Sequence, residues 1–209
     1  MTPPDDQSRP APRLGAEGRI IEGLVATRDE AGNCHIAPMG PLVGAQFDRL
    51  WLRPFVTSST YQNLRLRRAG VFHTTDDVEM LAAAAIGALR PLPAVTPAAA
   101  VEADVIVDAC MWFAFEVESV DDSTERSTIA ARVVDRGVLR EFTGFNRAKH
   151  AVVEAAILAT RVRILPAEQI IGELERLALP IQKTGSAAEV RAFAMLKDYV
   201  RAIAGAAKT

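Results

Sequence analysis

The stretch RPFVTSSTYQNL, residues 53–64, joins two kinds of secondary structure and decides the fold. Its first residues end an apolar and aromatic run that predicts a strand over 50–56. The hydroxyl residues at 57–60 are good helix N-caps, and a helix over 61–68 would end at Gly70. Hydroxyls, helix N–H groups and the Arg53 guanidinium at one turn favour a phosphate ligand. A capped helix without a ligand explains the same residues equally well.

Further strands are predicted on both sides of this stretch. Apolar runs separated by turn residues place them over residues 19–27, 34–39, 71–75, 112–120 and 127–134. The first two form a hairpin in which Thr27 is expected opposite Cys34, and Gly23 and Pro38 within it indicate a sheet edge or a bulge. A helix over 78–89 is predicted among these strands, because Asp76 and Glu79 have capping-box spacing.

The last third of the sequence has helical periodicity instead. Helices are predicted over residues 146–160, from Pro166 onward, and after the capping box of Ser186 and Glu189. The fold class is therefore α+β, with an antiparallel sheet, closed or nearly closed, followed by helices. We expect a disordered, proline-rich tail over 1–17, a sheet domain over 18–142 and a helical C-terminal region over 143–209.

Composition limits the possible classes of protein. The chain has 209 residues, of which 49% are hydrophobic, and a net charge of −2, so a folded core is expected and disorder of the whole chain is excluded. Its apolar runs are too short to span a membrane, and the first residues lack a secretory signal pattern. Cys34 and Cys110 lie far apart without metal-ligand spacing, which fits a reduced, cytoplasmic setting.

Several common catalytic motifs are absent from the sequence. It contains neither a Gly-x-Ser-x-Gly elbow nor a P-loop or Rossmann glycine pattern. His35, His73 and His150 are too scattered to predict a metal site. Asp76 and Asp77 could form a carboxylate pair, but helix capping explains Asp76 better. No side chain is therefore assigned as catalytic.

The order of four short motifs resembles the FMN-binding split barrel of flavin-reductase-like proteins. These motifs are APM at 37–39, RPF at 53–55, STYQNL at 59–64 and AGVF at 69–72. More closely, about nine tenths of the chain resembles an uncharacterised conserved family that has this barrel and a helical C-terminal extension. GFNRAKH at 144–150 and KTG at 183–185 carry the match in the extension.

The resemblance implies an FMN site. The phosphate would be held by the hydroxyl run with its amides (Thr57, Ser59, Thr60) and neutralised by Arg53, while Asn63 would fix the turn or reach the ribityl chain. The isoalloxazine ring would lie along residues of the 34–39 strand and its end, namely His35, Ala37, Pro38, Met39 and Gly40. His35 stands where those proteins have Asn, and Gly40 where they have Ser.

The resemblance also implies a function and an assembly. We expect an FMN-binding flavoprotein, a flavin-reductase-like oxidoreductase of unknown substrate, that forms a homodimer with flavin near the interface. Trp112, Phe113 and Phe115 are candidates for that interface, although barrel core explains two of them at least as well. A basic cluster at Asn146, Arg147, Lys149 and His150 either meets an anionic partner or is a solvated helix face.

Two other functions remain open at this point. One is an FMN-binding scaffold without turnover. The other is a non-enzymatic binding module that meets nucleic acid through Arg65, Arg67 and Arg68. The negative net charge and an aromatic content of only 6% make nucleic-acid binding the weaker alternative.

Overall fold

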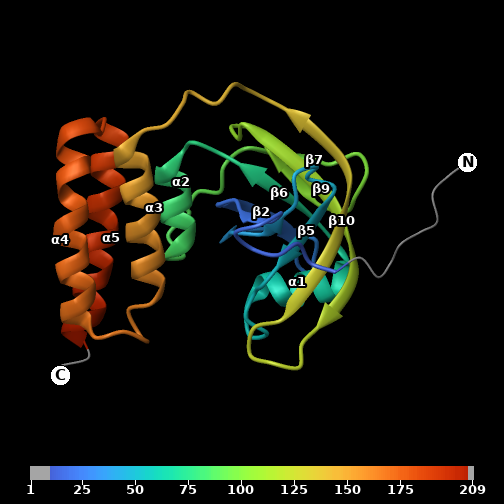
Figure 1. The fold of residues 1–209 in the computed structure, drawn as a ribbon, viewed down its shortest axis with the longest axis horizontal. Coiled ribbons are helices and arrows are strands. Elements are labelled where there is room, and N and C mark those ends of the chain that lie inside the picture. Colours follow the sequence, from blue (N-terminus) through green and yellow to red (C-terminus); the bar gives the residue numbers. More distant parts are fainter. Residues whose placement is uncertain (1–9, 207–209) are drawn as a thin grey trace, which may run out of the picture. The chain divides into compact units, whose positions relative to one another are not determined.

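The computed structural model describes residues 10–206, which form two compact units (Figure 1). One unit contains the sheet and takes in the described residues up to 74 together with 94–140. The other is helical and takes in 75–93 together with the described residues from 141 onward. The segment 75–93, which the sequence placed in the sheet domain, thus groups with the C-terminal helices.

The sheet unit is built on eight antiparallel strands. They are β1 (Arg19–Ile20), β2 (Gly23–Arg28), β3 (Cys34–Met39), β4 (Leu42–Val43), β5 (Arg49–Leu52), β6 (Ala69–Thr74), β9 (Met111–Asp121) and β10 (Thr128–Val138). Their order across the sheet is β1-β4-β5-β10-β9-β6-β2-β3.

The connection between β3 and β4 shows that this sheet curls into a barrel. β3 is the last strand of the order and β4 the second, yet only Gly40 and Pro41 separate them in the chain. Three peptide steps span at most about 11 Å, so the two ends of the sheet must come close together. Figure 1 shows the resulting curl, with β10 bent across one side.

The inside of the barrel is an aromatic and aliphatic core. Phe72, Phe113 and Phe115 are buried there with Leu50 and Leu52. Phe113 and Phe115 are therefore core residues, in agreement with the alternative that barrel core explains two of the three aromatic residues. Side chains alternate along a strand, and Trp112 accordingly packs half-buried beside a different cluster.

A small ribbon that the sequence did not reveal packs on β2 and β6. It consists of β7 (Val95–Pro97) and β8 (Asp104–Ile106), where the prolines had indicated only a linker. Fully buried His73 accepts a 3.0 Å hydrogen bond at Nε2 from the backbone N–H of Ile106. Arg28 Nε donates to Asp104 Oδ2 at 2.9 Å. These two bonds tie the ribbon to the barrel.

The predicted first hairpin is present with a shifted register. Thr27 lies opposite His35, one residue from the expected Cys34, and Gly23 lies opposite Met39. β3 is an edge strand, as Pro38 indicated. Residues 1–9 of the tail predicted over 1–17 lie outside the described residues. In the rest of that segment, Gly18 N donates a hydrogen bond to Arg13 O at 3.0 Å and closes a turn.

The helical unit contains four helices within the described residues. They are α2 (Val78–Ala85), α3 (Arg147–Thr160), α4 (Ala167–Thr184) and α5 (Ala187–Ala206). Buried alanine, valine and leucine side chains from all four form one core. The N-cap of α2 is Asp77, whose Oδ1 accepts from Met80 N at 2.9 Å, and not Asp76 as the sequence spacing predicted.

Candidate functional site

Helix α1 (Ser59–Arg67) begins at the hydroxyl run, as expected. The Ser58 hydroxyl is its N-cap: it accepts from Tyr61 N at 3.2 Å and donates to Phe55 O at 2.7 Å. The helix ends at its C-cap Arg68, which adopts φ +56°, and not at Gly70 as the sequence predicted. Gly70 lies within β6 instead. A Cβ at Gly70 would lie 2.7 Å from Phe115 Cζ, which explains why this strand position is glycine.

Helix α1 packs against β2 and β3, with its buried side directed to the barrel. Thr60 and Asn63 are both buried on that side. Asn63 Nδ2 donates to Thr27 Oγ1 at 3.0 Å, and Thr27 belongs to β2. Thr60 and Asn63 could therefore contact a ligand only from the side of the helix that faces the barrel.

The edge strand β3 presents three of the predicted residues to this same face. Directly opposite residues of neighbouring strands point to one side of a sheet. His35 lies opposite Thr27, and Ala37 lies opposite the barrel-core residue Val25. Met39, two residues further along, packs against the barrel core as well.

Two predicted ring-side residues are placed differently. Pro38 lies between Ala37 and Met39 on β3, so its side chain points to the opposite face of the strand. Gly40 lies in the link to β4, where a Cβ would come within 2.8 Å of both Ile20 Cγ2 and Glu22 Oε1. A serine at position 40 would require these two side chains to move, which accounts for glycine there.

The remaining predicted residues are exposed: Arg53 and Thr57 lie on the loop into α1, and Ser59 is the first residue of that helix. The loop is held by the β9–β10 hairpin, because Ser127 donates to Pro54 O from both its N–H and its hydroxyl, each at 3.0 Å. Val56 N also donates to Glu125 O at 3.0 Å. Within residues 10–206, Arg53 forms no hydrogen bond with the hydroxyl groups of residues 57–60. Arg53 and these hydroxyls are therefore close in sequence but are not bonded to one another.

The start of α1 offers hydrogen-bond donors without a competing carboxylate. Helix geometry leaves the first N–H groups without an intrahelical acceptor, and the first turn of α1 contains no acidic residue. The first turns of α2, α4 and α5 contain Glu79, Glu168 and Glu189, respectively, whereas the first turn of α3 also lacks an acidic residue. The hydroxyls at the start of α1, the helix dipole and the Arg53 guanidinium on the preceding loop are donors of the kind that suit a phosphate.

Two titratable side chains at the start of β3, His35 and Cys34, are neutral at physiological pH. Burial lowers the pKa of His35, and the charge of Asp29 opposes this only in part. Burial and the neighbouring Asp104 raise the pKa of the Cys34 thiol to about 12, so it remains protonated. His35 therefore has a neutral imidazole, which can both donate and accept a hydrogen bond.

The structure also shows a hollow of about 430 Å³ that the sequence did not predict. Its lining residues are Gln46, Phe47, Asp48, Val133, Val134, Asp135 and Arg136. Phe47 adopts φ +54° and stacks on Phe113, with ring centroids 4.4 Å apart. The hollow lies beside an irregularity in the β9–β10 pairing between Val133 and Asp135. Such a bulge depends on the register of the two strands, which no local sequence pattern indicates.

The basic cluster at the start of α3 is largely structural. Asn146 Oδ1 caps the helix by accepting from Ala148 N and Lys149 N, and Asn146 Nδ2 donates to Thr184 O. Lys149 Nζ donates to Asp76 O at 2.7 Å and lies 3.3 Å from its carboxylate. These bonds explain both the GFNRAKH and the KTG motifs, while Arg147 and His150 remain exposed.

The three arginines of α1 and its C-cap are bonded within the sheet unit. Arg65 lies near the Asp122 carboxylate, Arg67 donates to the carbonyls of Asp29 and Glu30, and Arg68 donates to the carbonyl of Val117. The structure thus explains these side chains without a nucleic-acid partner.

Residues 10–206 contain neither a membrane-spanning helix nor a cluster of metal-ligating side chains. None of their helices is both long and apolar enough to cross a membrane. No group of three or more His, Cys, Asp or Glu side chains among them is arranged to hold a metal ion.

Comparison with solved structures supports the split-barrel fold. The chain is similar to an FMN-bound protein from Methanosarcina mazei, with a TM-score of 0.75, 20% identity, and coverage of 86% of this chain and 94% of that one. A weaker likeness is to 2-nitrobenzoate 2-nitroreductase from Pseudomonas fluorescens, with a TM-score of 0.49, 16% identity, and coverage of 60% of this chain and 66% of that one. Another is to the styrene monooxygenase flavin reductase from Pseudomonas putida, with a TM-score of 0.47, 16% identity, and coverage of 56% of this chain and 78% of that one. The predicted fold, a split barrel followed by helices, is confirmed.

Comparison of the sequence itself identifies the family. No curated protein matches the sequence. The N-terminal domain of a family described as protein of unknown function (DUF447) matches residues 21–140, and the second domain of that family matches residues 146–198. The similar protein from Methanosarcina mazei is described with the same family. The chain therefore belongs to the DUF447 family of proteins of unknown function.

Proposed function

We propose that this protein binds FMN in its barrel unit and uses it in a flavin-reductase-like oxidoreductase reaction. The observation that carries the proposal is the carboxylate-free, donor-rich start of α1 beside the edge strand β3. The FMN-bound family member from Methanosarcina mazei, which has the same fold, adds support for the choice of ligand.

The residues present fit the phosphate end of FMN. The phosphate would accept hydrogen bonds from the first N–H groups of α1 and from the Thr57 and Ser59 hydroxyls, and Arg53 would neutralise its charge. Thr60 and Asn63 face the barrel and would orient the chain that leads from the phosphate to the ring. The bonds of Ser127 and Glu125 to the loop fix these donors in advance, which lowers the entropy lost on binding.

The inner face of β3 fits the ring end. Ala37 and Met39 would cover apolar parts of the ring and exclude water, and His35 would offer a neutral imidazole to its polar edge. Pro38 would act through its carbonyl rather than its side chain, which points away. FMN itself supplies hydride or single-electron transfer when bound.

Turnover is the part of the proposal that most needs a test. The protein loaded with FMN would be mixed without oxygen with NADH or NADPH, and bleaching of the visible flavin band followed over time. Reduction clearly faster than that of free FMN supports an oxidoreductase. Reduction at the rate of free FMN would instead favour a flavin-binding scaffold without turnover.

We also propose, from the resemblance to split-barrel proteins, that the protein forms a homodimer with flavin near the interface. Trp112 is the remaining aromatic candidate for that surface, since it is only half-buried. Sedimentation equilibrium of the full chain tests the assembly, and a monomer at micromolar concentration would contradict it.

A further inference from the structure

An aromatic ring and a guanidinium are stacked beside the phosphate-binding loop. Phe55 lies on this loop and exposes 41% of its surface. The Arg126 guanidinium, from the β9–β10 hairpin, lies over the Phe55 ring, with its carbon 4.5 Å from the ring centroid. We call these two side chains the Phe55–Arg126 platform.

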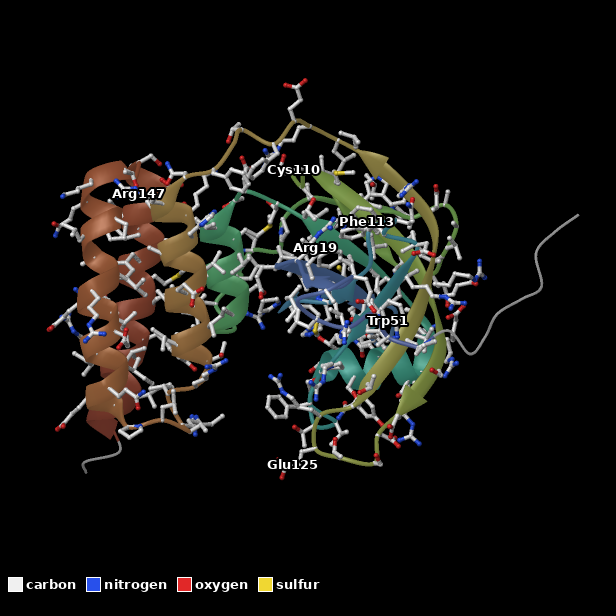
Figure 2. All side chains as sticks on the ribbon, viewed as in Figure 1. Arg19, Trp51, Cys110, Phe113, Glu125 and Arg147 are labelled. Atoms are coloured by element: carbon white, nitrogen blue, oxygen red, sulfur yellow. The ribbon has the colours of Figure 1, made fainter. Side chains whose placement is uncertain are left out.

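The backbone on both sides holds this platform in place. Phe55 and Arg126 are opposite residues of an isolated antiparallel bridge. The neighbouring residues Val56 and Ser127 donate backbone hydrogen bonds across the same junction, to Glu125 O and Pro54 O. Figure 2 shows Glu125 at the far end of the hairpin. The platform is therefore organised before any ligand arrives, although both of its side chains remain exposed to solvent.

The charges at the platform are not neutralised within the fold. Within residues 10–206, the guanidinium groups of Arg126 and Arg53 form neither a hydrogen bond nor an ion pair with an acidic side chain. By contrast, Arg65, Arg67 and Arg132 each lie within 4 Å of a carboxylate. Two cations and one stacking surface thus face solvent on one loop and the adjoining hairpin.

This combination suits a single purine that carries phosphate. A guanidinium stacked on an aromatic ring presents its outer face to a heteroaromatic base, and its N–H edges to phosphate oxygens. An oligonucleotide would need further stacking rings and cations along a groove, whereas the arginines of α1 are bonded within the fold.

We infer that the Phe55–Arg126 platform is a subsite for the adenosine phosphate part of an adenine dinucleotide. The purine would stack on the outer face of the Arg126 guanidinium, and its phosphate would lie between Arg126 and Arg53. The inference rests on the proposed function in one respect: Arg53 is also the cation assigned to the flavin phosphate. The dinucleotide is either FAD as an alternative cofactor or a nicotinamide dinucleotide as the electron donor.

The test uses the full chain and three probes: FMN, FAD and ADP. Affinities for FMN and FAD are measured by flavin fluorescence, and ADP binding by calorimetry with both the flavin-free and the FMN-loaded protein. The variants are Arg126→Ala, Phe55→Ala and Arg126→Lys, which keeps the charge but loses the planar group. Arg163→Ala, at an exposed arginine of the helical unit, is the matched control for charge.

If FAD is the source, the unaltered protein binds FAD about tenfold more tightly than FMN. Arg126→Ala and Phe55→Ala then remove this preference and leave the FMN affinity within about twofold. If a nicotinamide dinucleotide is the source, ADP binds the FMN-loaded protein, and the same two variants abolish that binding. Arg126→Lys weakens either ligand, because stacking is lost, and Arg163→Ala changes neither.

Equal affinities for FAD and FMN together with no binding of ADP would overturn the inference. The inference would also be overturned if the preference for FAD over FMN, or the binding of ADP, persisted in both Arg126→Ala and Phe55→Ala. Failure of the proposed FMN site is distinguishable from both, since ADP binding to the flavin-free protein still reports on the platform alone. Loss of that binding in Arg126→Ala supports the subsite even where FMN does not bind.

Discussion

Asn63 and Thr27 join helix α1 to the barrel through a 3.0 Å hydrogen bond between Nδ2 and Oγ1. Both side chains are buried, and Thr27 lies directly opposite His35 on the edge strand. One bond therefore joins the helix whose start is proposed to hold the phosphate to β2, the neighbour of the strand proposed to line the flavin ring. We regard this bond as the element that holds the two halves of the proposed FMN site in register.

Removing the donor should destabilise the fold measurably. Asn63→Ala leaves the buried Thr27 hydroxyl without its partner, at an expected cost of about 1–3 kcal/mol in the free energy of unfolding. The double variant with Thr27→Val should recover part of this loss, because both polar groups are then absent. Denaturant unfolding of the two single variants and the double variant gives the coupling, and strictly additive losses would show that the bond contributes nothing.

The phosphate assignment is tested by changing two of its residues together. Arg53→Ala combined with Ser59→Ala, both at exposed positions, should lower FMN affinity by roughly 3 kcal/mol, or about a hundredfold in Kd, because charge-assisted hydrogen bonds to the phosphate are lost. Arg163→Ala removes the same charge from an exposed site on the helical unit and should leave Kd unchanged. Near-native affinity in the double variant would refute the assignment.

His73 should make the stability of the protein fall in mild acid. Burial lowers its pKa to about 4, from an ordinary value of 6.5. Below pH 6.5 the unfolded chain binds a proton that the folded chain does not, so stability is complete above this pH and decreases toward pH 4. The expected loss from pH 7 to pH 5 is roughly 2 kcal/mol.

The contribution of this histidine can be separated from that of the carboxylates. His73→Gln keeps a side-chain acceptor for the Ile106 N–H but cannot titrate. Denaturant unfolding at pH 7 and at pH 5 should therefore show a smaller loss in this variant than in the unaltered protein. Equal losses in the two proteins would mean that His73 is protonated in the folded state.

Asp76 and Asp77 are adjacent, but their removal should have different costs. Asp77→Ala loses the N-cap bond to Met80, worth about 1 kcal/mol. Asp76 is buried and accepts from the Thr143 hydroxyl at 2.7 Å beside the Lys149 ammonium, so Asp76→Ala should cost about 2 kcal/mol or more. Thermal melts of both variants test the order, and the reverse order would restore Asp76 as the cap.

The sequence predicted those parts of the fold that depend on local patterns. Apolar runs located β3, β6 and the β9–β10 hairpin to within a few residues, and cap residues located α1 and α5. The β7–β8 ribbon was missed because its first strand is short and contains Pro97, which normally marks a break. The N-cap of α2 was misplaced by one residue because Asp76 and Asp77 are equally good caps by composition, and only tertiary contacts of Asp76 distinguish them.

The candidate site was predictable to the extent that its residues are adjacent in the sequence. The loop into α1 could be recognised from its hydroxyls and Arg53 alone. The alternation that turns Pro38 away from His35 follows from the strand period, but which face meets α1 depends on the long-range bond between Asn63 and Thr27. The Phe55–Arg126 platform joins residues 71 positions apart, so no local pattern indicates it.

The most direct test of the account is the visible spectrum of the purified protein, recorded before and after addition of FMN. We predict either a yellow preparation or, for flavin-free protein, a shifted and saturable flavin band on titration with FMN. A colourless protein that leaves the spectrum of added FMN unchanged would contradict the proposed FMN site and reduce the likeness to flavin-binding proteins to one of fold alone.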